Sequence, residues 1–555
     1  MNIKKLALLL CVALSATAFE SDACTNLLVG KKASTDGSTI VSYAADSHTL
    51  YGFLAFQPAA DHQPGSVREI YDWDTGTYHG VIPEVPHTYS VVGNMNEHQL
   101  TIVESTWGGR EELVDTTANA IMDYGSLIYV TLQRAKTARE AIDVIAKLLS
   151  DDGYNSSGES FSICDPNEIW VMDLIGKGGK SKGAVWVAQR IPDDCISAHA
   201  NFARNQCFPL NDKKNCLYSP DVISFARQMG YFNGKDADFN YAKAYCPVDF
   251  GGIRGCEARV WSYFNRYSDG MDAYLPYVNC EPGAEAFPLY VKANKKISVR
   301  DIQNMMRDHF EGTPFDMTLD PGAKMNYDVP YRWRPMHFKV DGQEYLHERA
   351  IATQQTGFVL VSQMRSWLPD AVGGVHWFAC DDANTATFVP MYCCMTSVPK
   401  SYAKETADLY HFSTESAFWV ANWVANQAYS RYNLMIDDIR KVQKGFEDYY
   451  EAHQPIIEAQ ALDLMKTAPE KAVALLNAYS NAEGQRCTAA YKDLAEYLLV
   501  KFLDGNRKRE KNGQFEYNKW GVPVSPEFTG YQQEYFNAII ADPAAKERLK
   551  VKEVK

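Results

Sequence analysis

The chain has 555 residues, of which 46% are hydrophobic and 22% charged, and its 69 acidic residues against 55 basic ones give a net charge of −14. This composition excludes a disordered chain, a fibrous repeat and a simple coiled coil. The acidic excess argues against non-specific binding to nucleic acid, because phosphates would be repelled.

The first 23 residues have the pattern of a secretory signal peptide. Lys4 and Lys5 precede an apolar run over residues 6–19, and a polar stretch with small residues at the −3 and −1 positions ends at Ala23. We expect cleavage after Ala23 and export to the periplasm or the extracellular space. The run is shorter than the roughly 20 residues of a transmembrane helix, and no later segment has that character, so no transmembrane segment is expected.

The N-terminal part of the mature chain alternates as β structure does. One helix is predicted over residues 118–150, because Leu132, Ala135 and Ile142 recur at helical spacing. The order of strands, helix and strands favours an α+β layered domain. Strands rich in β-branched residues are predicted on both sides of this helix, at residues 24–30, 38–43, 50–57, 88–92, 99–104, 160–164, 168–174 and 184–189.

Residues 208–345 are predicted to form long aromatic loops with one helix at 299–310, because Pro, Gly and Cys are frequent there. Strand character returns at 353–361 and 375–392. We place the α+β domain at residues 24–400 on this pattern.

Residues 401–555 are predicted to form a helical C-terminal region. A helix is expected to begin near Ser413, and Pro455 and residues 481–484 are expected to interrupt the later helices.

Cys24 becomes the first residue if the signal peptide is cleaved as expected. It then carries a thiol, the strongest protein nucleophile, and a free α-amine with a pKa near roughly 7.7–8. Nucleophile and base would thus be one residue. Three alternatives stay open: lipidation of Cys24, a structural disulfide, and cleavage elsewhere that leaves Cys24 internal.

The other cysteines suggest disulfides without defining them. Cys207 with Cys216, and members of the group Cys246, Cys256 and Cys280, are candidates in an oxidising compartment. Free buried cysteines are the alternative. No CxxC occurs, and the spacing is not that of a zinc site.

An ordered series of motifs follows Cys24. It comprises residues 24–30 and 35–41, Gly93-Asn94-Met95-Asn96-Glu97-His98-Gln99-Leu100, residues 160–170, 186–192 and 200–201, Arg332-Trp333-Arg334-Pro335, residues 348–353, 363–365 and 377–382. Together these segments, which extend to about residue 400, resemble the C69 dipeptidases. These are N-terminal-nucleophile hydrolases, distantly similar to penicillin V acylase and bile salt hydrolase.

This resemblance implies an αββα sandwich with Cys24 at the end of a central strand, and a reaction that needs no metal or organic cofactor. Asp46 stands where the family places an acid that holds the N-terminal amine or thiol. Asn96 and Asn201 would supply polar contacts to the oxyanion. The alternatives are a turn cap for Asp46 and local backbone caps for the two asparagines.

One position departs from the family pattern. Tyr43 stands where relatives often carry an arginine, and a tyrosine cannot supply a permanent cation to lower the thiol pKa. Arg110 is a candidate replacement, and the alternative is an exposed loop arginine. Glu97, beside Asn96, is a candidate partner for the N-terminal ammonium of a substrate, and the alternative is a surface carboxylate.

The sequence therefore predicts an exported cysteine dipeptidase that hydrolyses small peptides through a thioester on Cys24, with its own α-amine as base. An acyl-amide amidase of the same superfamily, of the bile salt or penicillin V type, is the nearest alternative. A lipidated protein that binds ligands without catalysis is the alternative from another class.

Overall fold

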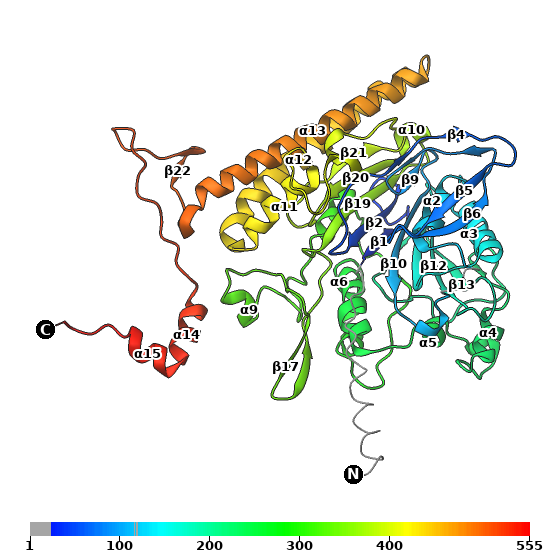
Figure 1. Cartoon of the computed structure of the whole chain (residues 1–555), viewed down its shortest axis with the longest axis horizontal. Coiled ribbons are helices and arrows are strands. Elements are labelled where there is room, and N and C mark those ends of the chain that lie inside the picture. Colours follow the sequence, from blue (N-terminus) through cyan, green and yellow to red (C-terminus); the bar gives the residue numbers. More distant parts are fainter. Residues whose placement is uncertain (1–23, 116, 118–119, 555) are drawn as a thin grey trace, which may run out of the picture.

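The computed structural model describes residues 24–115, 117 and 120–554, so the predicted signal peptide lies outside the described residues. Two antiparallel sheets form its centre (Figure 1). The first sheet has seven strands, in the spatial order β16 (Tyr290–Lys292), β14 (Cys195–His199), β1 (Asn26–Val29), β2 (Thr39–Asp46), β19 (Thr356–Met364), β20 (Val375–Cys380) and β21 (Val389–Tyr392).

The second sheet is built mainly from four long neighbouring strands and ends in short ones. Its spatial order is β15 (Cys216–Tyr218), β13 (Ala184–Ile191), β12 (Ile169–Gly176), β11 (Gly158–Cys164), β10 (Thr101–Trp107), β9 (Met95–Asn96), β8 (Val91–Val92) and β3 (Phe56–Gln57). Two-stranded ribbons flank the sheets: β4 (Ala60–Asp61) with β7 (His87–Thr88), β5 (Val67–Tyr71) with β6 (Tyr78–Pro83), and β17 (His337–Val340) with β18 (Gln343–Leu346).

The sheets pack face to face and helices cover their outer faces. Val29 and Val41 of the first sheet share one hydrophobic cluster with Val103 and Val171 of the second. Every residue of β2, β11 and β12 is buried, because each of these strands has a packed layer on both faces. The arrangement is the predicted αββα sandwich.

The outer face of the second sheet is covered by two helices where the sequence predicted one. The predicted helix over 118–150 is wrong as a single element, and two of its residues lie outside the described ones. The chain forms α2 (Tyr124–Leu132) and α3 (Ala138–Asp152). Thr137 is extended between them and caps α3 by accepting a hydrogen bond from the backbone of Glu140. The apolar spacing continues across the break because both helices pack on one sheet face.

Most predicted strands are confirmed, with shifts at their ends. The strand predicted at 50–57 is wrong over most of its length, since only Phe56–Gln57 pairs. Residues 208–345 contain more helix than predicted, and the helix predicted at 299–310 ends at Met305. The helices there are α4 (Val222–Gln228), α5 (Tyr241–Tyr245), α6 (Ala258–Tyr267), α7 (Leu275–Val278), α8 (Val299–Met305) and α9 (Pro321–Lys324).

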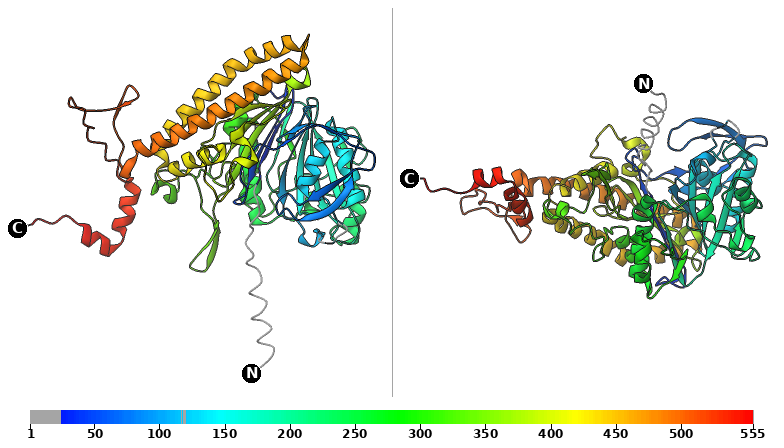
Figure 2. Two further views of the ribbon diagram at one scale, coloured as in Figure 1. Left: turned by 45° about the horizontal axis from the view of Figure 1, so that its top comes forward. Right: turned by 90° about the horizontal axis from the view of Figure 1, so that it is seen from below.

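The C-terminal helices cover the outer face of the first sheet. After the short helix α10 (Asp370–Gly373), the long helices are α11 (Ala417–Ala428), α12 (Tyr432–Met465) and α13 (Pro469–Lys501). The last two lie side by side as an antiparallel pair across the sheet (Figures 1 and 2). Their apolar residues join the cluster of the sandwich, so this region packs on the domain rather than standing apart from it.

The interruptions predicted in these helices are wrong. Pro455 lies inside α12, and α13 runs through residues 481–484 without a break. At Gly484 a Cβ would come within 2.6 Å of the Pro399 ring. The glycine therefore serves a close approach between the helix and the preceding loop, not a helix end.

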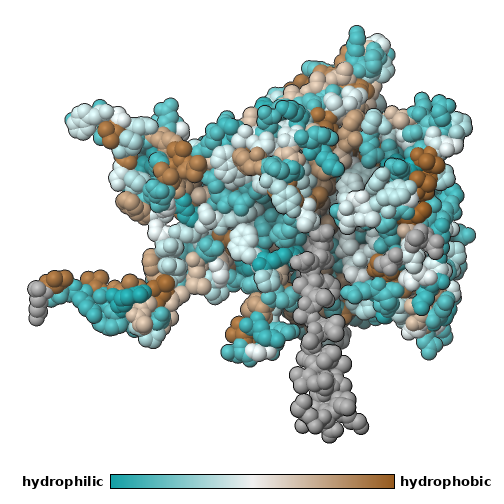
Figure 3. All heavy atoms as spheres, in the orientation of Figure 1, coloured by the Kyte–Doolittle hydropathy of each residue, from teal (hydrophilic) through white to brown (hydrophobic). Residues whose placement is uncertain are grey.

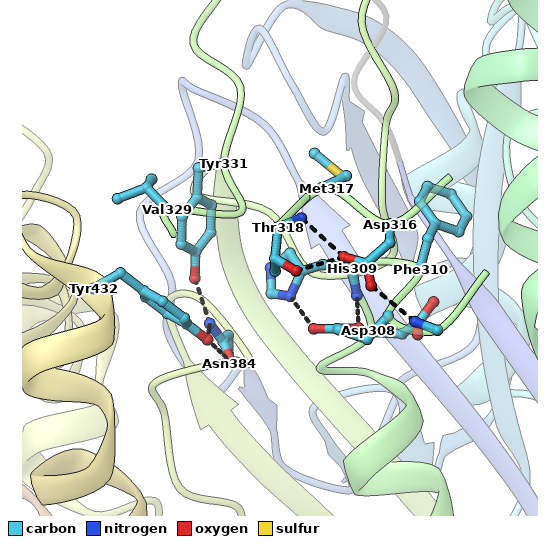
Figure 4. A network of polar contacts seen from close by, with 12 residues as sticks. Asp308, His309, Phe310, Asp316, Met317, Thr318, Val329, Tyr331, Asn384 and Tyr432 are labelled. Carbon is cyan, nitrogen blue, oxygen red and sulfur yellow. Dashed lines mark hydrogen bonds and ion pairs between the residues drawn. The ribbon is translucent and has the colours of Figure 1, made fainter. Parts of the chain in front are cut away.

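A polar network joins the loop after α8 to the C-terminal helices (Figure 4). The amide of Asn384 donates to the hydroxyls of Tyr331 and Tyr432, at 2.8 and 3.0 Å. Asp316 accepts from Thr318 within the same loop, and the His309 carbonyl accepts from the backbone of Met317. Through Asn384, the segment that carries Tyr331 is held against Tyr432, the first residue of α12, beside the sandwich.

The chain ends in an arm beyond α13. Its elements are β22 (Glu510–Lys511), β23 (Gln514–Phe515), α14 (Gln533–Ala541) and α15 (Pro543–Leu549), and it extends away from the sandwich (Figure 2). Large apolar side chains such as Trp520 and Phe528 are exposed on it, and hydrophobic atoms mark it in Figure 3. Within residues 24–554 as described, no helix has the length and apolar character to cross a membrane.

Candidate active site

Cys24 lies directly before β1, where Thr25 pairs with Ala44 of β2. Its side chain is only 4% exposed and forms part of the floor of a pocket with a volume of about 160 Å³. The pocket lies between the end of the first sheet and the helix α2. The predicted position of Cys24, at the end of a central strand, agrees with this geometry.

The pocket is acidic and aromatic. Among the described residues that line it, none is Lys, Arg or His. The lining carries three carboxylates, those of Asp46, Asp74 and Glu104, together with aromatic rings and small polar groups from Tyr43, Ser47, Thr49, Trp73, Asn94, Thr106, Tyr124, Tyr129 and Phe358. A cationic or amine-bearing ligand suits such a lining better than an anionic one.

The thiol of Cys24 contacts a carboxylate rather than a cation. Its Sγ lies 3.3 Å from Oε1 of Glu104 and 3.8 Å from the hydroxyl of Tyr43. Burial raises the pKa of the thiol well above its usual value, and the charges of Glu104 and Asp46 raise it further. A hydrogen bond from the backbone N–H of Asp46 opposes this effect. The resting thiol is therefore protonated.

Asp46, the last residue of β2, lines the pocket as a paired carboxylate. Its Oδ2 accepts from Arg349 at 2.8 Å, and its Oδ1 accepts from the hydroxyl of Thr356 at 2.6 Å. Burial raises the pKa of this carboxyl, and the charge of Arg349 acts in the opposite direction. The structure thus brings Asp46 and Cys24 together as the sequence predicted.

Glu104 was not predicted as a site residue, yet it is the polar side chain nearest to the thiol. It lies in β10, is 2% exposed and accepts a hydrogen bond from the hydroxyl of Tyr43. Burial raises the pKa of Glu104 to about 7, while the hydrogen bonds from Tyr43 and Cys24 lower it. Tyr43, in the place of the family arginine, therefore acts on the thiol through this carboxyl.

Arg259 of α6 supports the backbone beneath the thiol. Its Nη1 donates to the Cys24 carbonyl and to the Thr25 hydroxyl, both at 2.7 Å, and its Nη2 donates to Oδ1 of Asn201 at 2.9 Å. Burial lowers the pKa of this guanidinium to about 10, so it remains charged at neutral pH. Arg259 holds Cys24 and Asn201 in one frame.

The two predicted asparagines have different places. Asn201, with a φ of 56°, donates to the carbonyl of Thr106, a pocket residue, at 2.5 Å. The structure does not bring Asn96 to the pocket. The Asn96 amide donates to the carbonyls of Leu132 and Ala135, both at 2.7 Å, and so holds the C-terminal end of α2. Asn94 of the same segment lines the pocket instead.

Glu97 and Arg110 also lie outside the pocket lining. The carboxylate of Glu97 accepts from the backbone of Ser90 in the hairpin next to β9. The guanidinium of Arg110 donates to the carbonyl of Ala244 at 2.6 Å and stacks over the ring of Tyr231 at 3.6 Å. Each side chain is engaged locally, which is why neither reaches the thiol.

Asp74, which was not predicted as a site residue, lines the pocket, whereas Glu97 does not. It lies in the exposed turn between β5 and β6 and accepts from the hydroxyl of Tyr124 at 2.8 Å. Trp73 stacks on Tyr129 of α2, with ring centroids 4.7 Å apart. The turn is thus docked on α2, and it presents a carboxylate and an indole to the pocket.

Some of the missed residues had a signal in the sequence. Glu104 is a charged residue within the predicted strand 99–104, and a charge in a strand buried on both faces requires a reason. Arg349 lies in a motif that was quoted without a role. Arg259 and Asp74 had none: the region around Arg259 was predicted as loops, and the turn with Asp74 meets the pocket through Tyr124, 50 residues along the chain.

Comparisons with known proteins identify the family of this chain. The model of peptidase family C69 matches residues 23–64 and 58–445. The chain belongs to peptidase family C69. A probable dipeptidase of Latilactobacillus sakei is 24% identical over 503 residues, covering 87% of this chain and 96% of that protein.

Two further proteins are similar to this C69 chain. A probable dipeptidase of Salmonella dublin is 26% identical over 393 residues, covering 67% of this chain and 81% of its own. A solved structure of penicillin V acylase from Agrobacterium tumefaciens aligns with a TM-score of 0.28 at 12% identity, over 69% of this chain and 89% of that one. The C69 chain is thus a hydrolase of a peptidase family.

Proposed function

We propose that this C69 hydrolase is an exported cysteine dipeptidase, active in the periplasm or outside the cell. The observation that carries the proposal is the pocket itself, in which the Cys24 thiol lies among three carboxylates and no lining Lys, Arg or His. A dipeptide with a free N-terminus brings an ammonium group one residue from its scissile bond. Such a cation is stabilised by nearby carboxylates in a partly desolvated pocket.

The proposed reaction proceeds through a thioester on Cys24, with its α-amine as base. After removal of residues 1–23, the thiol gives its proton to a base in the site as sulfur attacks the scissile carbonyl carbon, and the C-terminal amino acid leaves when its nitrogen takes a proton from the α-ammonium. Water then hydrolyses the thioester, and the α-amine, with a reference pKa near roughly 7.7–8, accepts the proton of the water. The pattern of residues 1–23 and the position of Cys24 support this proposal.

Asp74 is the proposed partner of the substrate ammonium, in place of Glu97. It lies at the open side of the pocket with Trp73, whereas Asp46 is already paired with Arg349. A cation between Asp74 and the face of Trp73 would gain both a carboxylate and a π-face.

The experiment that tests the proposal compares one dipeptide with its N-acetylated form. We expect acetylation to lower kcat/KM at least ~10²-fold, or about 2.7 kcal/mol of transition-state stabilisation. Cys24→Ala, assayed in parallel, identifies turnover from any contaminating peptidase. Equal rates for the two substrates would reject the dipeptidase and favour the acyl-amide amidase.

A further inference from the structure

A second buried carboxyl lies behind Glu104. Glu159 of β11 faces Thr106 of β10 across the sheet and is fully buried. Its Oε1 accepts from the Thr106 hydroxyl at 2.6 Å. Burial, and next to it the negative charge of the neighbouring Glu104, raises the pKa of Glu159 well above its usual value.

The two glutamates form a pair that shares a proton. Oε2 of Glu104 and Oε2 of Glu159 are both buried, and neither accepts a hydrogen bond from a donor among the described residues; this suits a proton held between the two carboxyls, each of which affects the pKa of the other. Two carboxylates in such contact cannot both be ionised at neutral pH. Glu159 therefore keeps a proton and donates it to Glu104, which leaves Oε1 of Glu104 as an acceptor toward the thiol.

The thiol needs a base at the moment of attack. Burial and the neighbouring carboxylates keep it protonated, and no cationic side chain lines the described pocket to stabilise a standing thiolate. A base must lie within hydrogen-bond reach of the proton that it removes. Oε1 of Glu104, at 3.3 Å from Sγ, meets this requirement.

We infer that Glu104 is a second base of the reaction: it takes the proton of the Cys24 thiol directly, while its partner Glu159 keeps the proton that the pair shares. The inference rests on the proposed function, because it requires Cys24 to be the nucleophile. It assigns the first proton transfer to Glu104 and leaves the transfers at the leaving group and at water to the α-amine.

The proton transfers balance over one turnover. In acylation the S–H bond breaks, its proton moves to Glu104, and sulfur bonds to the carbonyl carbon. The C–N bond then breaks, and the leaving nitrogen takes a proton from the α-ammonium. In deacylation the water proton moves to the α-amine, oxygen bonds to the carbonyl carbon, and the departing sulfur regains its proton from Glu104.

Other titratable groups face the pair from every packed element. Tyr43 and Asp46 lie on β2, Tyr124 on α2, and Tyr154 after α3; Asp74 lies in the turn above the pocket. Burial raises the pKa of each of the three tyrosines well above its usual value, so they remain neutral donors. Asp74 adds negative charge, which favours retention of the proton shared by the pair.

Glu104→Gln gives the decisive test because two readouts should move in opposite directions. Turnover of a free dipeptide should fall at least ~10²-fold, the usual contribution of a general base. Alkylation of Cys24 by iodoacetamide, followed on its peptide by mass spectrometry, should become at least ~10-fold faster at pH 7, because the thiol loses a neighbouring negative charge. Glu140→Gln, an exposed carboxylate in the first turn of α3, is the matched control and should change neither.

The outcomes separate this inference from the proposed function. Unchanged or faster turnover in Glu104→Gln, with Cys24→Ala inactive, would overturn the base role and leave the dipeptidase intact. A fall in both turnover and alkylation would also overturn it, since that is the result of a disturbed site. Full activity of Cys24→Ala would reject the proposed function itself.

Tyr43→Phe supplies an independent test that does not depend on the glutamine variant folding. The Tyr43 hydroxyl stabilises the ionised form of Glu104, so its loss should raise the pKa of Glu104. We expect the lower apparent pKa in the pH profile of kcat/KM, which marks the loss of activity in acid, to rise by about one pH unit. An unchanged lower pKa in this profile would contradict the inference.

Discussion

The buried carboxyl of Glu104 should make the stability of the protein depend on pH in an unusual direction. Burial raises the pKa of Glu104 from 4.5 to about 7. Between these values the folded protein holds a proton that the unfolded chain has lost, so the free energy of unfolding falls as the pH rises. The contribution of Glu104 is fully present below pH 4.5 and is lost as the pH rises through 7.

The size of this effect follows from the shift. One pKa unit corresponds to about 1.4 kcal/mol, so ionisation of Glu104 removes about 3 kcal/mol of unfolding free energy by pH 8. Glu104→Gln removes the titration while keeping the shape of the side chain. With an unfolding entropy of about 2.1 cal/mol/K per residue, 3 kcal/mol corresponds to about 3 °C in Tm for a chain of this length.

The assay is differential scanning calorimetry of wild type and Glu104→Gln at pH 4.5 and pH 8. We expect the Tm of the variant, relative to wild type, to rise by about 3 °C between the two pH values. Glu140→Gln should show no such change, because its carboxylate is exposed. A Tm difference that is the same at both pH values would refute the reasoning, since Glu104 would then titrate at its ordinary pKa.

The remaining predictions concern the thiol, the α-amine and the ammonium site. Cys24→Ala should fold and lose all turnover, and wild-type activity in this variant would exclude Cys24 as the nucleophile. Cys24→Ser should keep a small residual activity, because the hydroxyl is a poorer nucleophile than the thiol. An uncleavable extra residue before Cys24 should give a folded, inactive protein, because the α-amine becomes an amide; activity equal to the processed form would contradict this. Asp74→Asn should raise KM for a free dipeptide about tenfold and leave the rate of Cys24 alkylation unchanged; an unchanged KM would remove Asp74 from the site.

The layered fold could be predicted because local patterns and ordered motifs agree with it. β12, for example, is an apolar run that only Asp173 interrupts, and β11 alternates polar with apolar residues from Ser160 to Ile163; both patterns survive in the structure. The helix boundaries that were predicted wrongly are those that depend on tertiary contacts. Pro455 is accommodated within α12, and Gly484 lies in a helix because Pro399 packs against it. Neither circumstance can be read from the residues next to it.

The candidate site could be predicted only where the chain itself joins the residues. Cys24 and Asp46 lie on neighbouring strands, β1 and β2, and a motif links them. Glu104 reaches the thiol from the opposite sheet. Arg259 reaches the backbone carbonyl of Cys24 from α6, 235 residues along the chain. Asn96 was selected from the family resemblance and Glu97 because it is next to Asn96, but the hairpin that holds them directs Glu97 to Ser90 and Asn96 to the end of α2.

The most direct test of the account is the N-terminal sequence of the active, exported protein, read together with its intact mass. The account predicts that the chain begins at Cys24, with an unmodified amine and a mass that includes no lipid. An active protein that begins at any other residue, or one with an acylated Cys24 amine, would contradict the claim that this residue is both nucleophile and base.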